Sequence, residues 1–322
     1  MTELRVEGLE VGYVTEDGPV TVVDGLDLEL RRGEFLGLAG ESGSGKSTAA
    51  LAVVRLLRAP GFISGGRVLL GDRDILTMTD QQVREIRWRE VSMVMQNSLN
   101  ALNPVARIER QLAEVLDRGR AGERAADTPA ELLDLVGIER RRVRAYPHEL
   151  SGGMRQRVAI AMALALRPRV VLMDEPTTAL DVVVQDDIIR QVRRLQSEFG
   201  FAVLMITHDL PLLLQTADRV AVMYAGRLAE TAPAAEFGVR QEHPYSQGLV
   251  AAVPSLRGGP ARLTGLAGQP PDPSEPPSGC RFHPRCPLAE EQCSVEQPPL
   301  VAFDNGRRVA CHVTTRIMEG SR

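Results

Sequence analysis

The stretch that most constrains this chain is GESGSGKST, Gly40–Thr48, which fits the pattern G-x-x-x-x-G-K-[S/T] of a phosphate-binding loop. The preceding EFLGLAG reads as a strand, and the apolar residues of Ser47–Leu57 recur at helical spacing. The sequence therefore predicts a strand–loop–helix junction. Glycines there let backbone N–H groups turn towards an anion, and the positive end of the following helix points at the same place.

Lys46 is the only lysine in a chain that has 38 lysine and arginine residues together. Lysine has a thin stem and a compact charge that can reach between the β- and γ-phosphates of a nucleotide, whereas the planar fork of arginine would not fit there. Ser47 is the expected Mg²⁺ ligand. The predicted phosphate-contact residues of the loop are Gly40, Ser42, Gly43, Ser44, Gly45, Lys46, Ser47 and Thr48.

The composition is that of an ordinary soluble protein, with 322 residues, 43% of them hydrophobic and 25% charged. The net charge of −4 gives no reason to expect a nucleic-acid partner or general affinity for anionic membranes. The N-terminal MTELRVEGLEVGYV lacks the apolar region of a signal peptide, and the longest apolar run, Val158–Leu166, is far short of the roughly 20 residues of a membrane span. We expect a cytoplasmic protein that reaches a membrane only through partners.

Strands alternate with helices along much of the chain, which predicts an α/β fold with a parallel sheet. RVVLMDE (Arg169–Glu175) and FAVLMITHD (Phe201–Asp209) read as buried strands, with the amphipathic helix DDIIRQVRRLQSEF between them. The region from about Gln96 to Leu166 reads as a helical insertion. The character changes after about Pro233, and five prolines fall within Pro270–Pro277, which predicts a linker or an extended wrap.

Two further motifs suit a nucleotide site. Asp174 and Glu175 end a buried strand, where a carboxylate beside a phosphate loop holds Mg²⁺ and the next residue can polarise the attacking water. Ser151, Gly152 and Gly153 precede a long helix and can form a second anion site. Alone, the first pair would read as an acidic turn and the second as an ordinary N-cap. In combination with the loop we favour the functional interpretation.

At this point the chain resembles the ATP-binding subunit of an ABC transporter, over about residues 4–235. ELSGGM matches the family's signature LSGGQ except for Met154 at its last place, and we do not expect this departure to abolish function, because backbone amides and Ser151 make the main contacts. The resemblance implies a P-loop NTPase parallel-sheet core with an N-terminal antiparallel β subdomain and an inserted helical subdomain at about residues 97–165.

The resemblance also implies a division of the chain and a set of roles. It implies an ABC ATP-binding domain over residues 1–235 and an irregular, cysteine-bearing C-terminal extension over residues 236–322. The implied activity is Mg²⁺-dependent ATP hydrolysis with Lys46, Glu175 and His208 as catalytic residues. The other implied contacts are adenine stacking by Tyr13, a D-loop role for Asp181, and Mg²⁺ ligation by Ser47, Asp174 and the Q-loop residue Gln96.

The family's architecture implies several partners. Two ATPase subunits, identical or different, sandwich two ATP molecules, with Lys46 and Ser47 of one facing Ser151–Gly153 of the other. Two transmembrane permease subunits and an extracytoplasmic substrate-binding protein complete the implied transporter. The chain would then be a peripheral protein at the cytoplasmic face of the cell membrane.

Three stretches resemble the dipeptide/oligopeptide importers in particular, a subfamily that includes nickel-complex and glutathione importers. They are NSLNALNP after Gln96, HPYSQGLVAAVPS (His243–Ser255), and the cysteine-bearing C-terminal segment. Peptide import is the expected function, and import of a nickel complex or another small solute is the alternative. A non-transport ABC ATPase is a remoter alternative, because repair types split the cassette with a coiled coil and ribosome types carry two cassettes. A kinase would need neither LSGGM nor His208.

All four cysteines fall in the C-terminal extension, and structural disulfides are not expected in a cytosolic chain. Four thiolates can hold a [4Fe–4S] cluster or Zn²⁺, and His283 and His312 could complicate either count. Zinc sites favour close C-x₂₋₄-C pairs, which are absent, and the family resemblance favours the cluster. The expected order is therefore a [4Fe–4S] cluster, then zinc, then disulfides, with a structural role. The cysteines are Cys280, Cys286, Cys293 and Cys311.

Overall fold

The computed structural model describes residues 1–96, 102–119, 124–252, 266–303 and 306–320. By its contacts the chain divides into two units. Unit 1 consists of Met1–Leu4, Glu29–Phe35 and Leu69–Ile206. Unit 2 consists of Arg5–Leu28, Leu36–Val68 and Thr207–Arg322.

Unit 1 contains three parallel strands, β6 (Val91–Val94), β7 (Val170–Asp174) and β8 (Ala202–Ile206), in the order β8-β7-β6. Every residue of β7 and β8 is buried, as in parallel strands that are covered on both faces. The prediction of two buried strands is confirmed. Helix α6 (Val182–Phe199) joins them, and it buries Ile188, Val192 and Leu195 along one stripe.

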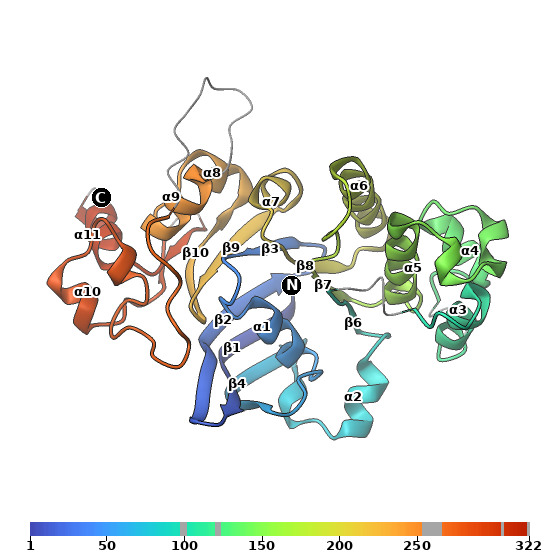
Figure 1. Cartoon of the computed structure of the whole chain (residues 1–322), viewed down its shortest axis with the longest axis horizontal. Coiled ribbons are helices and arrows are strands. Elements are labelled where there is room, and N and C mark those ends of the chain that lie inside the picture. Colours follow the sequence, from blue (N-terminus) through green and yellow to red (C-terminus); the bar gives the residue numbers. More distant parts are fainter. Residues whose placement is uncertain (97–101, 120–123, 253–265, 304–305, 321–322) are drawn as a thin grey trace. The chain divides into compact units, whose positions relative to one another are not determined.

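The insertion between β6 and β7 is helical, as predicted. Its helices α3, α4 and α5 contact one another and lie together in green in Figure 1. Thr128 and Glu131 form a capping box at the start of α4, which explains why the chain becomes helical directly after the polar break. The described elements of the insertion are α3 (Ile108–Leu116), α4 (Pro129–Leu135), η3 (Arg140–Arg144), η4 (Pro147–Glu149) and α5 (Gly152–Leu164).

Unit 1 also holds a short stretch before β6. There β5 (Arg73–Asp74) pairs with the end of β4 (Gly61–Leu70), and Thr79 caps helix α2 with a capping box. The other elements of the stretch are η1 (Ile75–Thr77) and α2 (Asp80–Ile86).

Unit 2 contains five strands in the order β11-β12-β10-β9-β3, with both parallel and antiparallel pairs. Strand β3 (Phe35–Ala39) is fully buried and runs parallel to β9 (Arg219–Tyr224), which pairs antiparallel with β10 (Arg227–Pro233). Helix α1 (Lys46–Val53) follows β3 after the glycine-rich loop, and α7 (Leu210–Thr216) precedes β9. The predicted strand–loop–helix junction is therefore confirmed.

The greater part of the antiparallel sheet also belongs to unit 2. Its long strands are neighbours in the order β2-β1-β4. More exposed and more buried positions alternate along much of β2, as in a strand with one covered face. The first two strands are β1 (Thr2–Thr15) and β2 (Gly18–Arg31).

The C-terminal extension is more integrated than its composition predicts. It returns to the sheet through β12 (Arg308–Val309), which pairs with β10 and with β11 (Val301–Ala302). Figure 1 shows the extension, coloured orange to red, along the β10 edge of this sheet. Its helices are α8 (Ala234–Val239), α9 (Pro244–Ala251), η5 (His283–Arg285), α10 (Glu291–Val295) and α11 (His312–Gly320).

A buried carboxylate on β10 holds the extension in place. Glu230 is 0% exposed and accepts hydrogen bonds from the backbone N–H groups of Glu242 (3.0 Å) and His243 (2.9 Å). It also pairs with Arg307, which is 3% exposed. A buried charge is tolerated when it is paired and hydrogen-bonded in this way, and here the partners come from both ends of the extension.

His243 begins helix α9 and is buried. Its Nδ1 accepts a hydrogen bond of 3.0 Å from the backbone N–H of Tyr245, so it caps the helix as a neutral imidazole. Burial lowers the pKa of His243 from 6.5 to about 4, and a hydrogen bond with the backbone of Ala310 acts in the opposite direction. Protonation of His243 is thus opposed by the folded state.

We predict that His243 makes the fold sensitive to acid. Between pH 6.5 and about 4 the unfolded chain binds a proton at this position that the folded chain does not, so stability falls as the pH falls. The loss should reach about 3 kcal/mol. His243→Asn keeps a side-chain acceptor for the cap and removes the titration. Urea unfolding of both proteins should be measured between pH 7 and 4. The free energy of unfolding should fall more steeply with falling pH in the wild type than in the variant, and an equal pH dependence would contradict the prediction.

Candidate functional site

Two glycines of the glycine-rich loop between β3 and α1 occupy positions that exclude a side chain. Gly40 has a φ of 151°, and a Cβ there would lie 2.2 Å from the backbone oxygen of Met223. Gly45, the N-cap of α1, has a φ of 96°, and a Cβ there would lie 2.8 Å from the backbone oxygen of Val22. Glycine alone meets both demands, because it has no Cβ and adopts left-handed backbone angles readily.

Lys46 is buried at the centre of this loop, with 6% of its surface exposed. Its Nζ donates to the backbone oxygens of Gly40 (2.7 Å) and Glu41 (2.7 Å) and to Oγ of Ser44 (3.1 Å). The loop thus encloses a compact ammonium at the start of a helix, where the helix dipole is positive. This combination of a fixed cation, backbone amides and a helix N-terminus is a site for an anionic group such as a phosphate.

The structure brings Tyr13 to the same loop within unit 2. The hydroxyl of Tyr13 lies 3.4 Å from Oγ1 of Thr48, within hydrogen-bonding distance. Ser47 is half-buried in the first turn of α1. His208 also belongs to unit 2, where it is exposed immediately before α7, whose N-cap is Asp209.

The acidic pair belongs to unit 1. Asp174 is the last residue of β7 and is 4% exposed. Glu175 follows with a φ of 46°, its N–H donates to the backbone oxygen of Ile206 (2.9 Å), and its carboxylate accepts a hydrogen bond from Thr178 (2.6 Å). A positive φ in a residue other than glycine stores strain, and such strain gathers at functional sites.

The remaining predicted residues of unit 1 lie at the ends of elements. Ser151 caps α5 by accepting a hydrogen bond from the N–H of Met154 (3.2 Å), and Asp181 caps α6 by accepting one from the N–H of Val184 (3.0 Å). Gly153 allows α5 to approach α6, because a Cβ there would lie 2.6 Å from Val184. Gln96 is exposed after β6. Gly152 is the first residue of α5.

Sequence reasoning missed three residues that fix the loop. The N–H of Glu41 donates to the hydroxyl of Tyr245 (2.8 Å), and the carboxylate of Glu41 accepts two hydrogen bonds from Arg285 (2.8 and 3.0 Å). Tyr245 and Arg285 are 204 and 244 residues away from Glu41 along the chain, so no local sequence pattern predicts these contacts.

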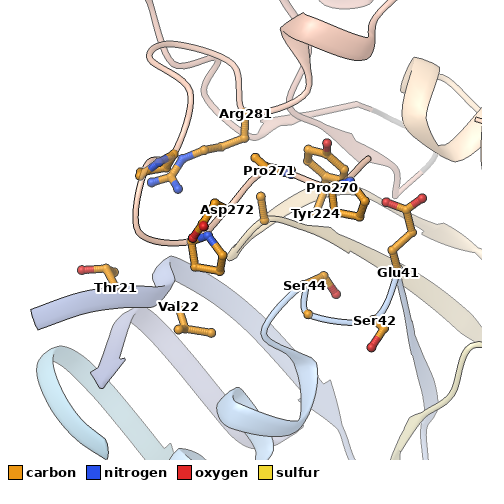
Figure 2. A pocket seen from close by; sticks show the side chains of 14 residues that line it. Thr21, Val22, Glu41, Ser42, Ser44, Tyr224, Pro270, Pro271, Asp272 and Arg281 are labelled. Carbon is orange, nitrogen blue, oxygen red and sulfur yellow. The ribbon is translucent and has the colours of Figure 1, made fainter. Parts of the chain in front are cut away.

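The proline-rich segment lies over the loop, as Figure 2 shows for Pro270, Pro271 and Asp272. A small hollow lies between this segment and Glu41–Ser44. The segment is thus an extended wrap, which was one of the two alternatives that its composition left open.

The four cysteines are free and all belong to unit 2. Cys293 and Cys311 are buried, and Cys280 and Cys286 are half-buried. Burial is the main cause that raises the pKa of the Cys280 thiol to about 11, and the other three thiols act in the same direction. In the part of the chain that the structure describes, no group of three or more histidine, cysteine or acidic residues is arranged to hold a metal ion. The donor types therefore suit a metal, while their arrangement is not that of a formed site.

Membrane insertion has no candidate segment in the structure. Among the described residues, every helix is too short or too polar to span a bilayer.

Comparison with known families gives two matches. Residues 23–178 match the ABC transporter family, and residues 229–293 match the C-terminal region of oligopeptide/dipeptide transporters. The first match includes the loop with Lys46 and the strand that ends in Asp174. The second includes Tyr245 and Arg285.

Individual relatives extend the similarity to nearly the whole chain. The oligopeptide transport ATP-binding protein OppD of Salmonella typhimurium is 45% identical over 96% of this chain and 92% of its own length. The corresponding AppD of Bacillus subtilis is 40% identical over 96% of both chains.

Solved structures show the same fold. The ATP-binding cassette MJ0796, in a dimer bound to ADP and Pi, is 26% identical with a TM-score of 0.64 over 72% of this chain and 98% of its own. CbiO1 of Clostridium perfringens is 28% identical with a TM-score of 0.62 over 74% of this chain and 91% of its own. The fold, the glycine-rich loop and both family matches agree: this chain belongs to the ABC transporter family, among the ATP-binding proteins of oligopeptide transporters.

Proposed function

We propose that this chain is the ATP-hydrolysing subunit that powers peptide import through a membrane ABC transporter. The observation that carries the proposal is the enclosed ammonium of Lys46 in a chain whose C-terminal region matches that of oligopeptide/dipeptide transporters. Import of a nickel complex or another small solute stays the alternative, because separate subunits select the substrate. The C-terminal match favours both over a non-transport ATPase.

In this proposal the loop binds the phosphates of ATP, and Tyr13 stacks on the adenine. Mg²⁺, when bound, neutralises charge on the β- and γ-phosphates, and the hydroxyl of Ser47, the carboxylate of Asp174 and the amide of Gln96 would hold it, since oxygen ligands suit this ion. Glu175 accepts the proton of the attacking water. His208 contacts the γ-phosphate.

The proposed assembly follows from the same roles. A second ATPase subunit contributes Ser151–Gly153 and Asp181 to each ATP, so hydrolysis requires two subunits. Two permeases and an extracytoplasmic binding protein complete the transporter, and the chain is peripheral at the cytoplasmic face. We place the ATP-binding domain at residues 1–235, its helical subdomain at about 97–165, and the extension at 236–322.

The assignment of Glu175 predicts a specific kinetic defect. Glu175→Gln should retain ATP binding and lose at least about 100-fold in turnover, because an amide cannot accept the proton of water. The ATP-loaded dimer should accumulate. Lys46→Arg should lose activity although the charge remains.

The measurement is steady-state ATPase activity of the assembled complex, with nucleotide binding measured in parallel. Glu198→Gln makes the same substitution at an exposed position of α6 and serves as the matched control. Near-normal turnover of Glu175→Gln or Lys46→Arg would refute the assignment.

A second surface suits the permease subunits. The backbone N–H and oxygen of Asn103 both bond to the side chain of Gln111 (2.8 and 3.1 Å), and Oδ1 of Asn103 accepts from the N–H of Val105 (3.1 Å). This holds Val105 83% exposed at a hollow with about 860 Å³ of empty space. Residues 97–101 of the NSLNALNP stretch lie outside the described residues. We propose that the permeases dock here.

Substitution of this surface should uncouple ATP hydrolysis from transport. Asn103→Ala removes the hydrogen bond that holds Val105, and Pro104→Ala removes the backbone restriction between Asn103 and Val105. Both variants should retain ATPase activity and reduce uptake several-fold. Uptake and ATPase activity are measured together in proteoliposomes. Asp17→Ala, in the exposed turn after β1, is the control. Normal uptake by both variants would place the docking surface elsewhere.

We also propose that the four cysteines bind one [4Fe–4S] cluster that stabilises the extension. Their confinement to one segment and their free thiols support it. The thiols would have to move into ligand positions as the cluster assembles, since the described arrangement is not a formed site. Zinc is the alternative occupant.

Anaerobically purified protein should contain about four iron and four acid-labile sulfide ions per chain, with a brown visible spectrum. Cys293→Ser should lose the iron and destabilise the extension, because metal binding contributes to the folding of such segments. A colourless and iron-free but fully folded protein, with stoichiometric zinc or two disulfides, would contradict the cluster.

A further inference from the structure

Glu41 is the one charged side chain of the phosphate-binding loop besides Lys46. It is a carboxylate on a loop that is built to attract anions, so its presence needs a physical explanation. Its side chain is 24% exposed and lies at the edge of the hollow in Figure 2. Its N–H bonds to Tyr245 and its carboxylate to Arg285, and both of these residues belong to the C-terminal extension in unit 2.

Arg285 forms a bidentate ion pair with Glu41, with nitrogen–oxygen distances of 2.8 and 3.0 Å. Its side chain is 6% exposed, and its other donors reach the hydroxyl of Tyr224 (3.2 Å) and the backbone oxygen of Ala267 (2.9 Å). The planar guanidinium can make all these bonds at once, which lysine cannot. Arg285 is thus fixed by four hydrogen bonds and not merely attracted to a nearby charge.

An aromatic cluster holds both partners of Glu41 in position. The rings of Tyr224 and Tyr245 are 4.5 Å apart, and Phe282 lies 5.2 Å from the first and 5.5 Å from the second. The guanidinium of Arg285 lies over Tyr224 and Phe282 at 5.7 and 5.9 Å. Burial raises the pKa of the Tyr245 hydroxyl, so it stays protonated while it accepts the N–H of Glu41.

A second arginine anchors the same segment near the loop. Arg281 pairs with Asp24, which Arg227 also binds at 3.0 Å. The N–H of Asp24 donates to the backbone oxygen of Gly226, whose own N–H donates to the backbone oxygen of Ser44 in the loop (3.0 Å each). Arg281 directly follows Cys280, and Arg285 directly precedes Cys286. The cysteine segment therefore carries both arginines, and these connect it to the phosphate-binding loop.

We propose that Arg285 is a positioning residue for the phosphate-binding loop: it neutralises Glu41 and fixes the start of the loop, so ATP affinity depends on the docked C-terminal extension. This rests on the proposed function, in which the loop binds ATP. Without Arg285 the carboxylate of Glu41 would be an uncompensated negative charge on the loop that binds the phosphates. Repulsion between such a charge and the phosphates should weaken binding by about tenfold.

The test is the dissociation constant of Mg²⁺–ATP for the full-length chain, measured by calorimetry. Arg285→Gln should raise it about tenfold, with a smaller defect at high salt because salt screens the exposed part of the repulsion. Glu41→Gln should weaken binding less than Arg285→Gln does, because it removes the repelling charge together with the ion pair. The double variant Glu41→Gln/Arg285→Gln should recover most of the affinity, because it removes the charge that Arg285 compensates.

Two further variants separate positioning from folding. Arg316→Gln breaks an exposed pair with Glu290 in the same extension and should bind ATP normally. Tyr245→Phe keeps the ring and removes the acceptor of the Glu41 N–H, so it should weaken ATP binding a few-fold. This variant tests the proposal even if Arg285→Gln does not fold. Arg285→Lys should recover part of the affinity.

The outcomes discriminate clearly. Recovery in the double variant supports charge compensation. A double variant as weak as Arg285→Gln, or an Arg285→Gln protein that binds as the wild type does, overturns the proposal. If the wild-type chain itself binds no ATP, the proposed function fails, and that result is distinct from the others.

Discussion

The enclosure of one ammonium group by its own loop is the interaction on which the site depends. Lys46 can lie among the oxygens of Gly40, Glu41 and Ser44 only because Gly40 and Gly45 allow the backbone to close around it. A Cβ at either glycine would collide with the backbone of Met223 or Val22. Strands β9 and β2, which hold Met223 and Val22, therefore set the shape of the loop, and the loop sets the position of the charge.

The C-terminal extension contributes to the rigidity of this loop. A loop made of glycines has little stiffness of its own, and Glu41 joins it to Tyr245 and Arg285, which are held in an aromatic cluster. The buried pair of Glu230 and Arg307 joins the same extension to β10. Tyr245 and Arg285, which contact the phosphate-binding loop, thus lie in the region that matches the oligopeptide/dipeptide transporters.

Local patterns predicted most of the fold. The buried strands β7 and β8 were predictable because uninterrupted apolar runs have few other solutions, and α6 because its apolar residues recur at helical spacing. Strand β12 was not predictable, since two residues that complete a distant sheet edge carry no pattern. The motif residues Lys46, Ser151 and Asp174 were found by spacing. Arg285 was missed, because an ion pair over 244 residues depends on the assembled fold, and the cysteines predict a donor set without a geometry.

Hydrogen–deuterium exchange of the full-length chain, with and without Mg²⁺–ATP, tests the central claim most directly. If the loop binds ATP and the extension braces it, nucleotide should slow exchange in Gly40–Thr48 and, in the same titration, in the segment Arg281–Cys286. Protection of the loop with no change in the extension would contradict the coupling, and no protection of the loop would contradict the nucleotide site itself.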